Sequence, residues 1–256
     1  MRSLTRFLTV AGVAGLLFML IALPAHAEPI PLPSLGIKPA TGPTEGVQTV
    51  QIMLALTVLS LAPAILILTT AFTRIVVVLG FLRTAIGTQQ LPPNQVLVGL
   101  ALFLTFAIMA PTFKTINNDA LQPYMRGEIQ QAEALQKASD PLKAFMLHYT
   151  RKDDLALMLE ITQTPDSPPL DKPEDTPFLT VVPAYAISEL RTAFTMGFLL
   201  FLPFLIIDLI TASTMMSMGM MMVPPTLVSL PFKILLFVLV DGWHLVVQSL
   251  VQSFRV

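Results

Sequence analysis

The sequence predicts an all-α, membrane-associated fold built from kinked helical hairpins. Hydrophobic residues make up 54% of the 256-residue chain and charged residues only 12%, about half the share of roughly 25% in ordinary soluble domains. Four apolar blocks are each long enough for a membrane helix of about 20 residues. Prolines and charged residues interrupt these blocks. Such a chain must place much of its apolar area against lipid or other subunits.

The composition argues against several classes of function. Cysteine is absent, which excludes disulfides, thiolate metal sites and cysteine nucleophiles. Outside the targeting segment only His148 and His244 remain, too few for an ordinary histidine zinc site. The net charge of −1 provides no basic field for nucleic acid. No HExxH, GxSxG, P-loop or GxGxxG pattern occurs, so we expect a non-enzymatic protein with no metal, cofactor or nucleic-acid partner.

The first 27 residues have the layout of a secretory signal peptide. Two arginines precede an apolar run from Phe7 to Leu23, and Ala25-His26-Ala27 forms a small-residue cleavage site. A signal anchor that stays attached is the alternative interpretation. Residues 28–46 are rich in proline and glycine and are predicted to form a flexible periplasmic leader.

Residues 47–113 are predicted to form the first helical hairpin. Its first block, Val47–Leu82, is long enough for a broken helix and contains Pro63. Its second block runs from Val96 to Phe113. Proline inside a helix removes a backbone hydrogen bond and kinks the helix, so we expect a kink at Pro63.

Residues 114–177 are predicted to form a soluble helical insert. They hold 11 acidic and 7 basic residues, most of the charge of the chain. Two polar-faced helices are expected, over 118–137 and 141–161. The second would start here because Asp140 suits an N-cap and Pro141 suits the first helical position. A proline-rich loop would follow it.

Residues 178–256 are predicted to form the second hairpin, with a methionine-rich turn. One block runs from Phe178 to about Ala212 and contains Pro203, where a second kink is expected. The other runs from Val223 to Val247. Both are long enough to span a membrane.

The signal peptide sets the expected orientation, with the mature N-terminus in the periplasm. The first hairpin would turn in the cytoplasm near Arg83, and the insert would return to the periplasm, which fits its acidic excess. The turn at 213–226 would then be cytoplasmic. It contains no lysine or arginine, which a simple four-span bundle does not explain.

Seven ionisable residues lie inside or beside the apolar blocks. A charge at bilayer depth costs at least about 2.5–3.5 kcal/mol. We therefore predict that these residues pair within the protein or make contacts between subunits, with snorkelling from helix ends as the alternative. Kinked helices that carry charge indicate a subunit of a larger assembly around an aqueous path. The seven residues are Arg74, Arg83, Glu189, Arg191, Asp208, Lys233 and Asp241.

Residues 215–222 read MMSMGMMM and hold six of the 14 methionines. Pro224-Pro225 follows, which places Met220, Met221 and Met222 on a turn. Methionine is apolar and adaptable, so in a ring of copies these turns would form a deformable gasket that resists ion leakage by dewetting. Ordinary packing in a turn between helices is the alternative.

Two other functions are open on residue chemistry. An ion or proton channel could use Arg74, Asp208, Lys233 and Asp241 as its path. Asp241 and His244 could share a helix face as a proton relay or as a helix-end pair. A membrane-embedded enzyme acting on lipid or peptide is disfavoured, because the sequence offers no nucleophile–base set and no metal set.

Three stretches resemble a known family. They are FTRIVVVLGFLRTAIGTQQLPPNQVLVGLALFLTFAIMAP from Phe72, PAYAISELRTAFTMGFLLFLPFLIIDL from Pro183, and MGMMMVPPTLVSLPFKILLFVLVDGW from Met218. Together they are similar to the FliP family, flagellar biosynthetic proteins of the type III secretion export gate. The resemblance covers nearly all of the chain from about Gln51. Gly80 and Arg191 stand where serine and lysine are common in the family.

The resemblance implies a pore-forming subunit that assembles into an oligomeric helical channel. The implied partners are further copies of the chain, Q-type and R-type export-gate components, other export-apparatus and basal-body ring proteins, membrane lipid and unfolded secreted substrates. Flagellar subunits would pass across the bacterial inner membrane, within the basal body. The family's gasket maps onto Met220, Met221 and Met222. Hairpins raised out of the bilayer would explain the uncharged turn, which would line the pore.

Overall fold

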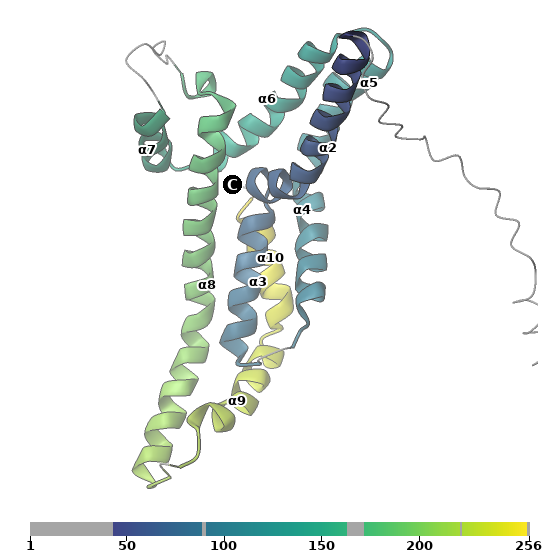
Figure 1. The fold of residues 1–256 in the computed structure, drawn as a ribbon. Helices are drawn as coiled ribbons and strands as arrows, with labels where there is room; N and C mark the ends of the chain where they lie inside the picture. The colour runs from purple at the N-terminus through teal and green to yellow at the C-terminus, as the bar shows by residue number, and fades with distance from the viewer. Residues whose placement is uncertain (1–42, 89–90, 163–171, 221, 255–256) are drawn as a thin grey trace, which may run out of the picture. The chain divides into compact units, whose positions relative to one another are not determined.

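The computed structural model describes residues 43–88, 91–162, 172–220 and 222–254. Regular structure throughout these residues is helical, so the predicted all-α class is confirmed (Figure 1). The predicted signal peptide, 1–27, lies outside the described residues. Contacts divide the chain into two units, 1–57 and 58–256, and helix α2 begins in the first.

The second unit contains most of the helices, which cover the predicted apolar blocks and the insert. Their bounds are α2 (Pro43–Thr69, begun in the first unit), α3 (Phe72–Ile86), α4 (Asn94–Ile116), a π-helix (Asn117–Leu121), α5 (Gln122–Met125), α6 (Gln131–Tyr149), α7 (Lys152–Thr162), a 3₁₀ turn (Pro173–Asp175), α8 (Phe178–Ser217), α9 (Pro225–Leu239) and α10 (Gly242–Gln252).

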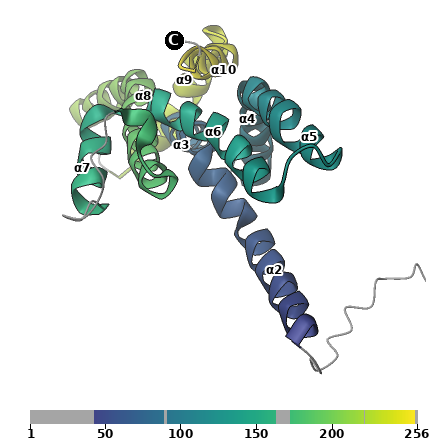
Figure 2. The same cartoon turned by 90° about the horizontal axis from the view of Figure 1, so that it is seen from above.

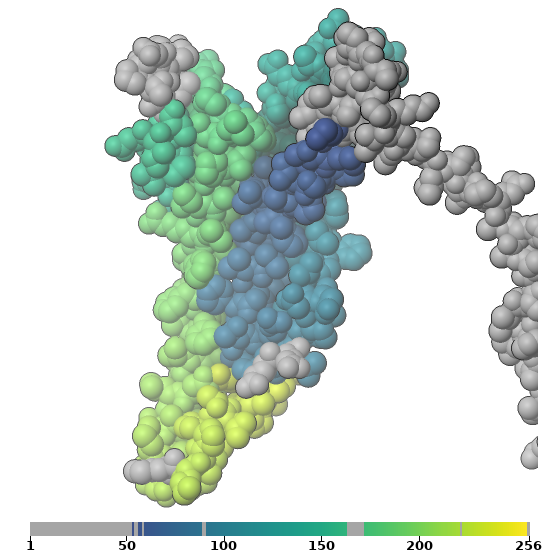
Figure 3. Space-filling model, viewed as in Figure 1, coloured from purple at the N-terminus to yellow at the C-terminus, as the bar shows by residue number. Residues whose placement is uncertain are grey.

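Helix α3 lies at the centre of the second unit. Ile75, Val78, Leu79 and Leu82 are almost completely buried and follow the i, i+3, i+4, i+7 spacing of one helix face. Helices α4, α8 and α9 all contact α3. Helix α8 lies between α3 and α7 (Figure 2), and the space-filling view shows α8 running alongside α3 with α9 at its lower end (Figure 3).

Helices α3 and α8 are in close contact at Gly197. A Cβ atom at this position would lie 2.6 Å from the ring of Phe81 and 2.9 Å from its Cβ. The Phe81 ring also meets Phe194 edge-on, with centroids 5.1 Å apart. Because the Cβ of Phe81 is fixed to its backbone, a side chain at 197 would push the two helices apart.

Gly197→Ala is therefore expected to lower stability by about 1–3 kcal/mol through overpacking. Gly99→Ala in α4 is the matched control, because nothing lies within 4 Å of a Cβ built there. Glycine is about 1 kcal/mol less favourable than alanine inside a helix, so Gly99→Ala should leave stability unchanged or raise it slightly. The thermal midpoints of the two variants in detergent test this; equal midpoints would mean that the α3–α8 contact is not tight.

Two bent helix pairs occupy the first and the last of the predicted apolar blocks. Residues 59–69 and α3 meet at 69°, and α9 and α10 meet at 63°. Helices α2 and α8 run through Pro63 and Pro203 without a break, so neither of these two bends lies at a proline expected to kink. A proline inside a helix removes one backbone hydrogen bond. The helix can continue through it where neighbouring groups bind the carbonyl that is left without a donor.

Threonine hydroxyls support the bend between α2 and α3. Thr69, Thr70 and Thr73 donate to the carbonyls of Ile65, Leu66 and Ile67 at 2.6–2.8 Å. The last four carbonyls of a helix lack backbone donors within it, and the hydroxyls of Thr70 and Thr73 donate to two of these in α2. The second bend has Asp241 in the left-handed region with φ 49°.

The second bend also depends on a close contact at Gly242. A Cβ there would lie 2.1 Å from the ring of Phe237, so that ring packs directly on the glycine backbone. Trp243 meets the same ring edge-on, with centroids 5.5 Å apart. These contacts fix the direction in which α10 leaves α9.

The predicted helix start at Pro141 was wrong. Helix α6 begins at Gln131 and runs through Asp140 and Pro141 to Tyr149. The local N-cap signal at Asp140 therefore does not set the helix start. Helix α6 packs against the π-helix, α4 and α8, and such packing can offset the one hydrogen bond lost at the proline.

The apolar helices are suited to a membrane. Among the described residues, Asn94–Met125 and Phe178–Ser217 are long and apolar enough to cross one, and the total there is up to four if each bent pair counts as one span. Only 22% and 17% of their most apolar windows are buried inside the unit. Most of this apolar surface therefore faces outward, as a lipid-facing or subunit-facing surface would.

Candidate functional site

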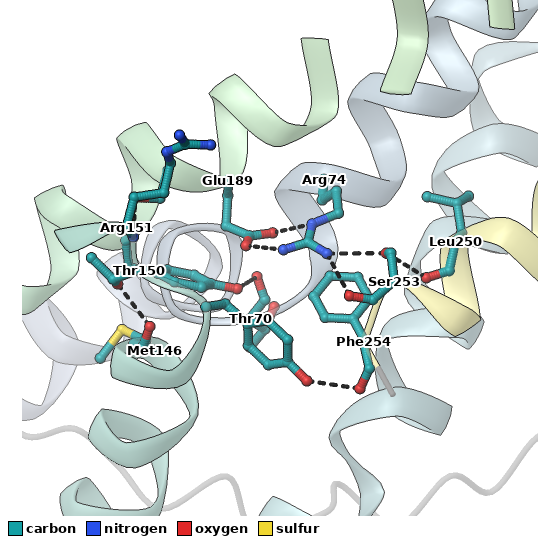
Figure 4. A network of polar contacts seen from close by, with 12 residues as sticks. Thr70, Arg74, Met146, Thr150, Arg151, Glu189, Leu250, Ser253 and Phe254 are labelled. Carbon is teal, nitrogen blue, oxygen red and sulfur yellow. Dashed lines mark hydrogen bonds and ion pairs between the residues drawn. The ribbon is translucent and has the colours of Figure 1, made fainter. Parts of the chain in front are cut away.

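Arg74 and Glu189 form a completely buried ion pair between α3 and α8. The Arg74 Nε donates to Glu189 Oε2 at 2.9 Å, and Nη2 donates to Oε1 at 2.5 Å. Their side chains are 4% and 0% exposed. The two parallel hydrogen bonds are the fork arrangement that arginine makes with a carboxylate. Figure 4 shows the two side chains pointing directly at each other.

The remaining side of Arg74 is also occupied. Its Nη1 donates to both the carbonyl oxygen and the Oγ of Ser253 at 3.0 Å. The guanidinium carbon lies 3.9 Å from the ring centroid of Phe254 and 5.5 Å from that of Tyr149. Arg74 therefore contacts α6, α8 and the residues that follow α10.

Two tyrosines link this centre to its surroundings. Tyr185 donates its hydroxyl to the carbonyl of Thr70 in the α2–α3 bend at 2.9 Å. Tyr149 donates to the carbonyl of Phe254 at 2.7 Å. Burial raises the pKa of the Tyr149 phenol, and the charge of Arg74 opposes part of this rise. The hydroxyl therefore stays protonated at neutral pH and remains a donor.

Ser188, next to Glu189, attaches α7 of the insert to α8. Its hydroxyl donates to Asp154 Oδ2 at 2.6 Å and accepts the backbone N–H of Arg151 at 3.0 Å. Asp154 and Ser188 are both buried. The insert is thus bonded to α8 beside the Arg74–Glu189 pair.

Asp208 and Lys233 form a second ion pair, between α8 and α9. Lys233 Nζ donates to Asp208 Oδ2 at 2.5 Å, and Ser229 donates its hydroxyl to Oδ1 at 2.6 Å. The Lys233 side chain is 5% exposed and that of Asp208 is 32% exposed. Lys233 Nζ also lies beside Gly87, the left-handed C-cap of α3. A cation is stabilised there by the negative end of the helix dipole.

The other three predicted charges are not brought together. Arg83 is half-buried, while Arg191 and Asp241 are exposed. Within the described residues no ion pair joins any of them to another side chain, and no hydrogen bond joins Asp241 to His244. Of the residues suggested for ion conduction, Arg74 and Lys233 are each paired with a separate carboxylate.

The methionine turn follows a Schellman motif at the end of α8. Met220 N–H donates to the carbonyl of Met215, and Gly219 N–H donates to that of Met216. Gly219 has φ +77°, the left-handed conformation that this motif requires. Pro225 then starts α9. Both ends of the turn are therefore fixed by local sequence.

The methionines of this turn are exposed. Met218 is 69%, Met220 44% and Met222 98% exposed, and Met221 lies outside the described residues. Beside them is an apolar cavity of about 520 Å³ lined by both helices of the hairpin, including Met215 of α8 and Phe232 of α9. Met218 and Met220 themselves line this cavity, and exposed methionines around an apolar cavity give a soft, deformable surface.

Sequence reasoning missed Ser229, Ser253, Phe254 and Tyr149. Ser229 and Lys233 are four residues apart on an apolar helix, and this spacing places both on one face. That pattern could have identified Ser229. The contacts of Phe254 and Tyr149 with Arg74 join segments distant in the chain and leave no local signal. Within the described ranges no three histidine, cysteine or acidic residues are placed to hold a metal.

The sequence is similar to those of known proteins. The model of the FliP family matches residues 55–250. The flagellar biosynthetic protein FliP of Bacillus subtilis is 58% identical, over 86% of this chain and 98% of its own length. The proteins of the same name from Caulobacter vibrioides and Aquifex aeolicus are 52% and 53% identical, over 91% and 82% of this chain and 86% and 87% of their own lengths.

Proposed function

Since the chain belongs to the FliP family of flagellar biosynthetic proteins, we propose that it is a pore-forming subunit of the flagellar type III export gate. In this role it passes unfolded flagellar subunits across the inner membrane during flagellum assembly. The chain provides the walls and seal of the channel and performs no catalysis.

The observation that carries this proposal is the methionine turn between α8 and α9. It presents Met218, Met220 and Met222 with large exposed fractions on a loop held at both ends. Soluble monomeric proteins rarely expose a contiguous apolar surface of this kind. In a ring of copies the turns meet and close around an unfolded chain of varying side chains, because methionine adapts its shape.

The rest of the chain fits the same assembly. Signal peptide 1–27 delivers the mature N-terminus and the leader 28–46 to the periplasm. The hairpins 47–113 and 178–256 pack against copies of the chain and against Q-type and R-type components, and the insert 114–177 meets its neighbours or the basal-body ring. The outward apolar surface of α4 and α8 supports contact with both lipid and subunits.

Replacing Met220, Met221 and Met222 together with alanine is expected to make the membrane leak small ions while secretion of flagellar subunits continues. Shortening three apolar side chains widens the seal and lets water enter it. Dye uptake and export of hook subunits would be measured in the native host. We expect uptake to rise severalfold, with export within about twofold of the parent.

Met125→Ala is the matched control, because Met125 is 72% exposed but lies in α5 of the insert. It should change neither readout. A triple variant with a tight membrane and normal export would show that the turn is ordinary packing and that the pore lies elsewhere.

A further inference from the structure

Phe254 presents the face of its ring to a buried cation. The guanidinium carbon of Arg74 lies 3.9 Å from the ring centroid, well inside the distance of about 6 Å at which the ring quadrupole attracts a cation. Phe254 is 7% exposed, so water screens this attraction little. Figure 4 shows Phe254 beside Arg74.

The orientation of this ring is fixed by its neighbours. Phe145 stacks nearly parallel to it, at an interplanar angle of 15°, and Tyr149 meets it edge-on with centroids 5.2 Å apart. The hydroxyl of Tyr149 holds the carbonyl of Phe254. If Phe254 only filled space, its ring could take other orientations. A cation–π contact requires the ring face to be directed at the charge.

The same arginine binds the end of α10. Its Nη1 donates to the carbonyl of Ser253, the C-cap residue of that helix. Helix-end carbonyls lack intrahelical donors and carry partial negative charge. Arg74 lies just after the α2–α3 bend, so one side chain connects that bend, α8 and the end of α10.

We propose that Phe254 is a positioning residue that holds Arg74 against Glu189 through a cation–π contact, and that this contact fixes the end of α10 to the α2–α3 bend. Two interactions connect Arg74 to the end of α10. They are the hydrogen bonds to Ser253 and the electrostatic attraction to the ring of Phe254. This inference does not depend on the pore function.

The test replaces Phe254 with mono-, di- and trifluorinated phenylalanine in the full-length protein. Fluorine withdraws electron density from the ring face with little change in size, so it weakens a cation–π contact while keeping the packing. The thermal midpoint of the detergent-solubilised protein is expected to fall stepwise, by about 1–2 °C per fluorine, because the whole contact is worth about 2 kcal/mol. A midpoint that does not change along the series would overturn the proposal.

The control series carries the same substitutions at Phe72, which is 8% exposed and has no cation over its ring within the described residues. It should show no stepwise fall. An equal fall at both positions would assign the effect to fluorine itself and overturn the proposal.

A second background tests Arg74 directly. In the double variant Arg74→Met with Glu189→Leu, the cation is absent and no buried carboxylate is left unpaired. In this background the thermal midpoint should no longer fall as fluorine is added to the ring of Phe254. If the stepwise fall persists without Arg74, the ring does not act through the arginine and the proposal fails.

Discussion

Glu189→Leu is expected to lower the free energy of unfolding by about 3–5 kcal/mol, the usual cost of removing one partner of a buried ion pair. The loss arises because Arg74 stays charged and its side chain is 4% exposed, so water cannot replace the carboxylate. Ser253 and Phe254 would still contact the guanidinium but cannot neutralise it. The amount of protein in the membrane fraction, its thermal midpoint in detergent and swimming in soft agar should all fall.

The double variant Arg74→Met with Glu189→Leu separates charge from packing. Two apolar side chains of similar volume are expected to recover much of the lost stability, because neither leaves a buried charge. Swimming would recover only if the pair has no role beyond stability. A double variant as unstable as Glu189→Leu would instead show that the shape of this centre matters more than its charge.

Glu133→Gln provides a matched exposed control. Glu133 pairs with Lys137 at 2.9 Å, but the two side chains are 52% and 44% exposed. Exposed pairs of this i, i+4 type contribute about 0.3–0.5 kcal/mol. Its midpoint should therefore stay close to that of the parent. Equal losses at Glu133 and Glu189 would contradict the view that burial sets the cost.

Features with a local cause could be predicted from the sequence. The apolar runs lie where α4 and α8 occur, because a membrane-length helix requires a long apolar stretch. The methionine turn could also be placed, since Gly219 and Pro225 have direct roles at a helix end and a helix start. These signals depend only on residues a few positions apart.

Features with a tertiary cause could not be placed. The bend after Thr69 is supported by threonine hydroxyls, and the bend at Asp241 by the contact between Phe237 and Gly242. The positions of the prolines did not predict either bend. Helix α6 starts at Gln131 and runs through Asp140 and Pro141, so the local N-cap signal does not set its start. The sequence indicated that buried charges should have partners, but which helices meet depends on the fold.

Asp208→Asn is expected to lower stability more than Lys233→Met, although both break the same ion pair. Both changes keep the approximate size of the side chain. Lys233 is 5% exposed, so losing the Asp208 charge leaves a buried cation without an anion, at a cost of about 3 kcal/mol. Losing Lys233 leaves Asp208 32% exposed and still bonded to Ser229, at about 1–2 kcal/mol.

Thermal midpoints and membrane-fraction levels of the two single variants and the double variant test this asymmetry. The double variant should lie above Asp208→Asn, because the unpaired cation is gone. Ser229→Ala isolates the hydrogen bond to Asp208 and should cost about 1 kcal/mol.

The size of the Lys233→Met effect also reports what surrounds Asp208. A third of its side chain is open within this single chain, and a carboxylate without its lysine is tolerated in water but not in lipid. A small loss therefore means that the exposed part of Asp208 faces water, as it would on the wall of an aqueous channel. A loss as large as that of Asp208→Asn means that lipid or a neighbouring subunit covers it. The same ion pair joins the two helices that carry the methionine turn, so this measurement also tests whether the turn is held at the edge of an aqueous path.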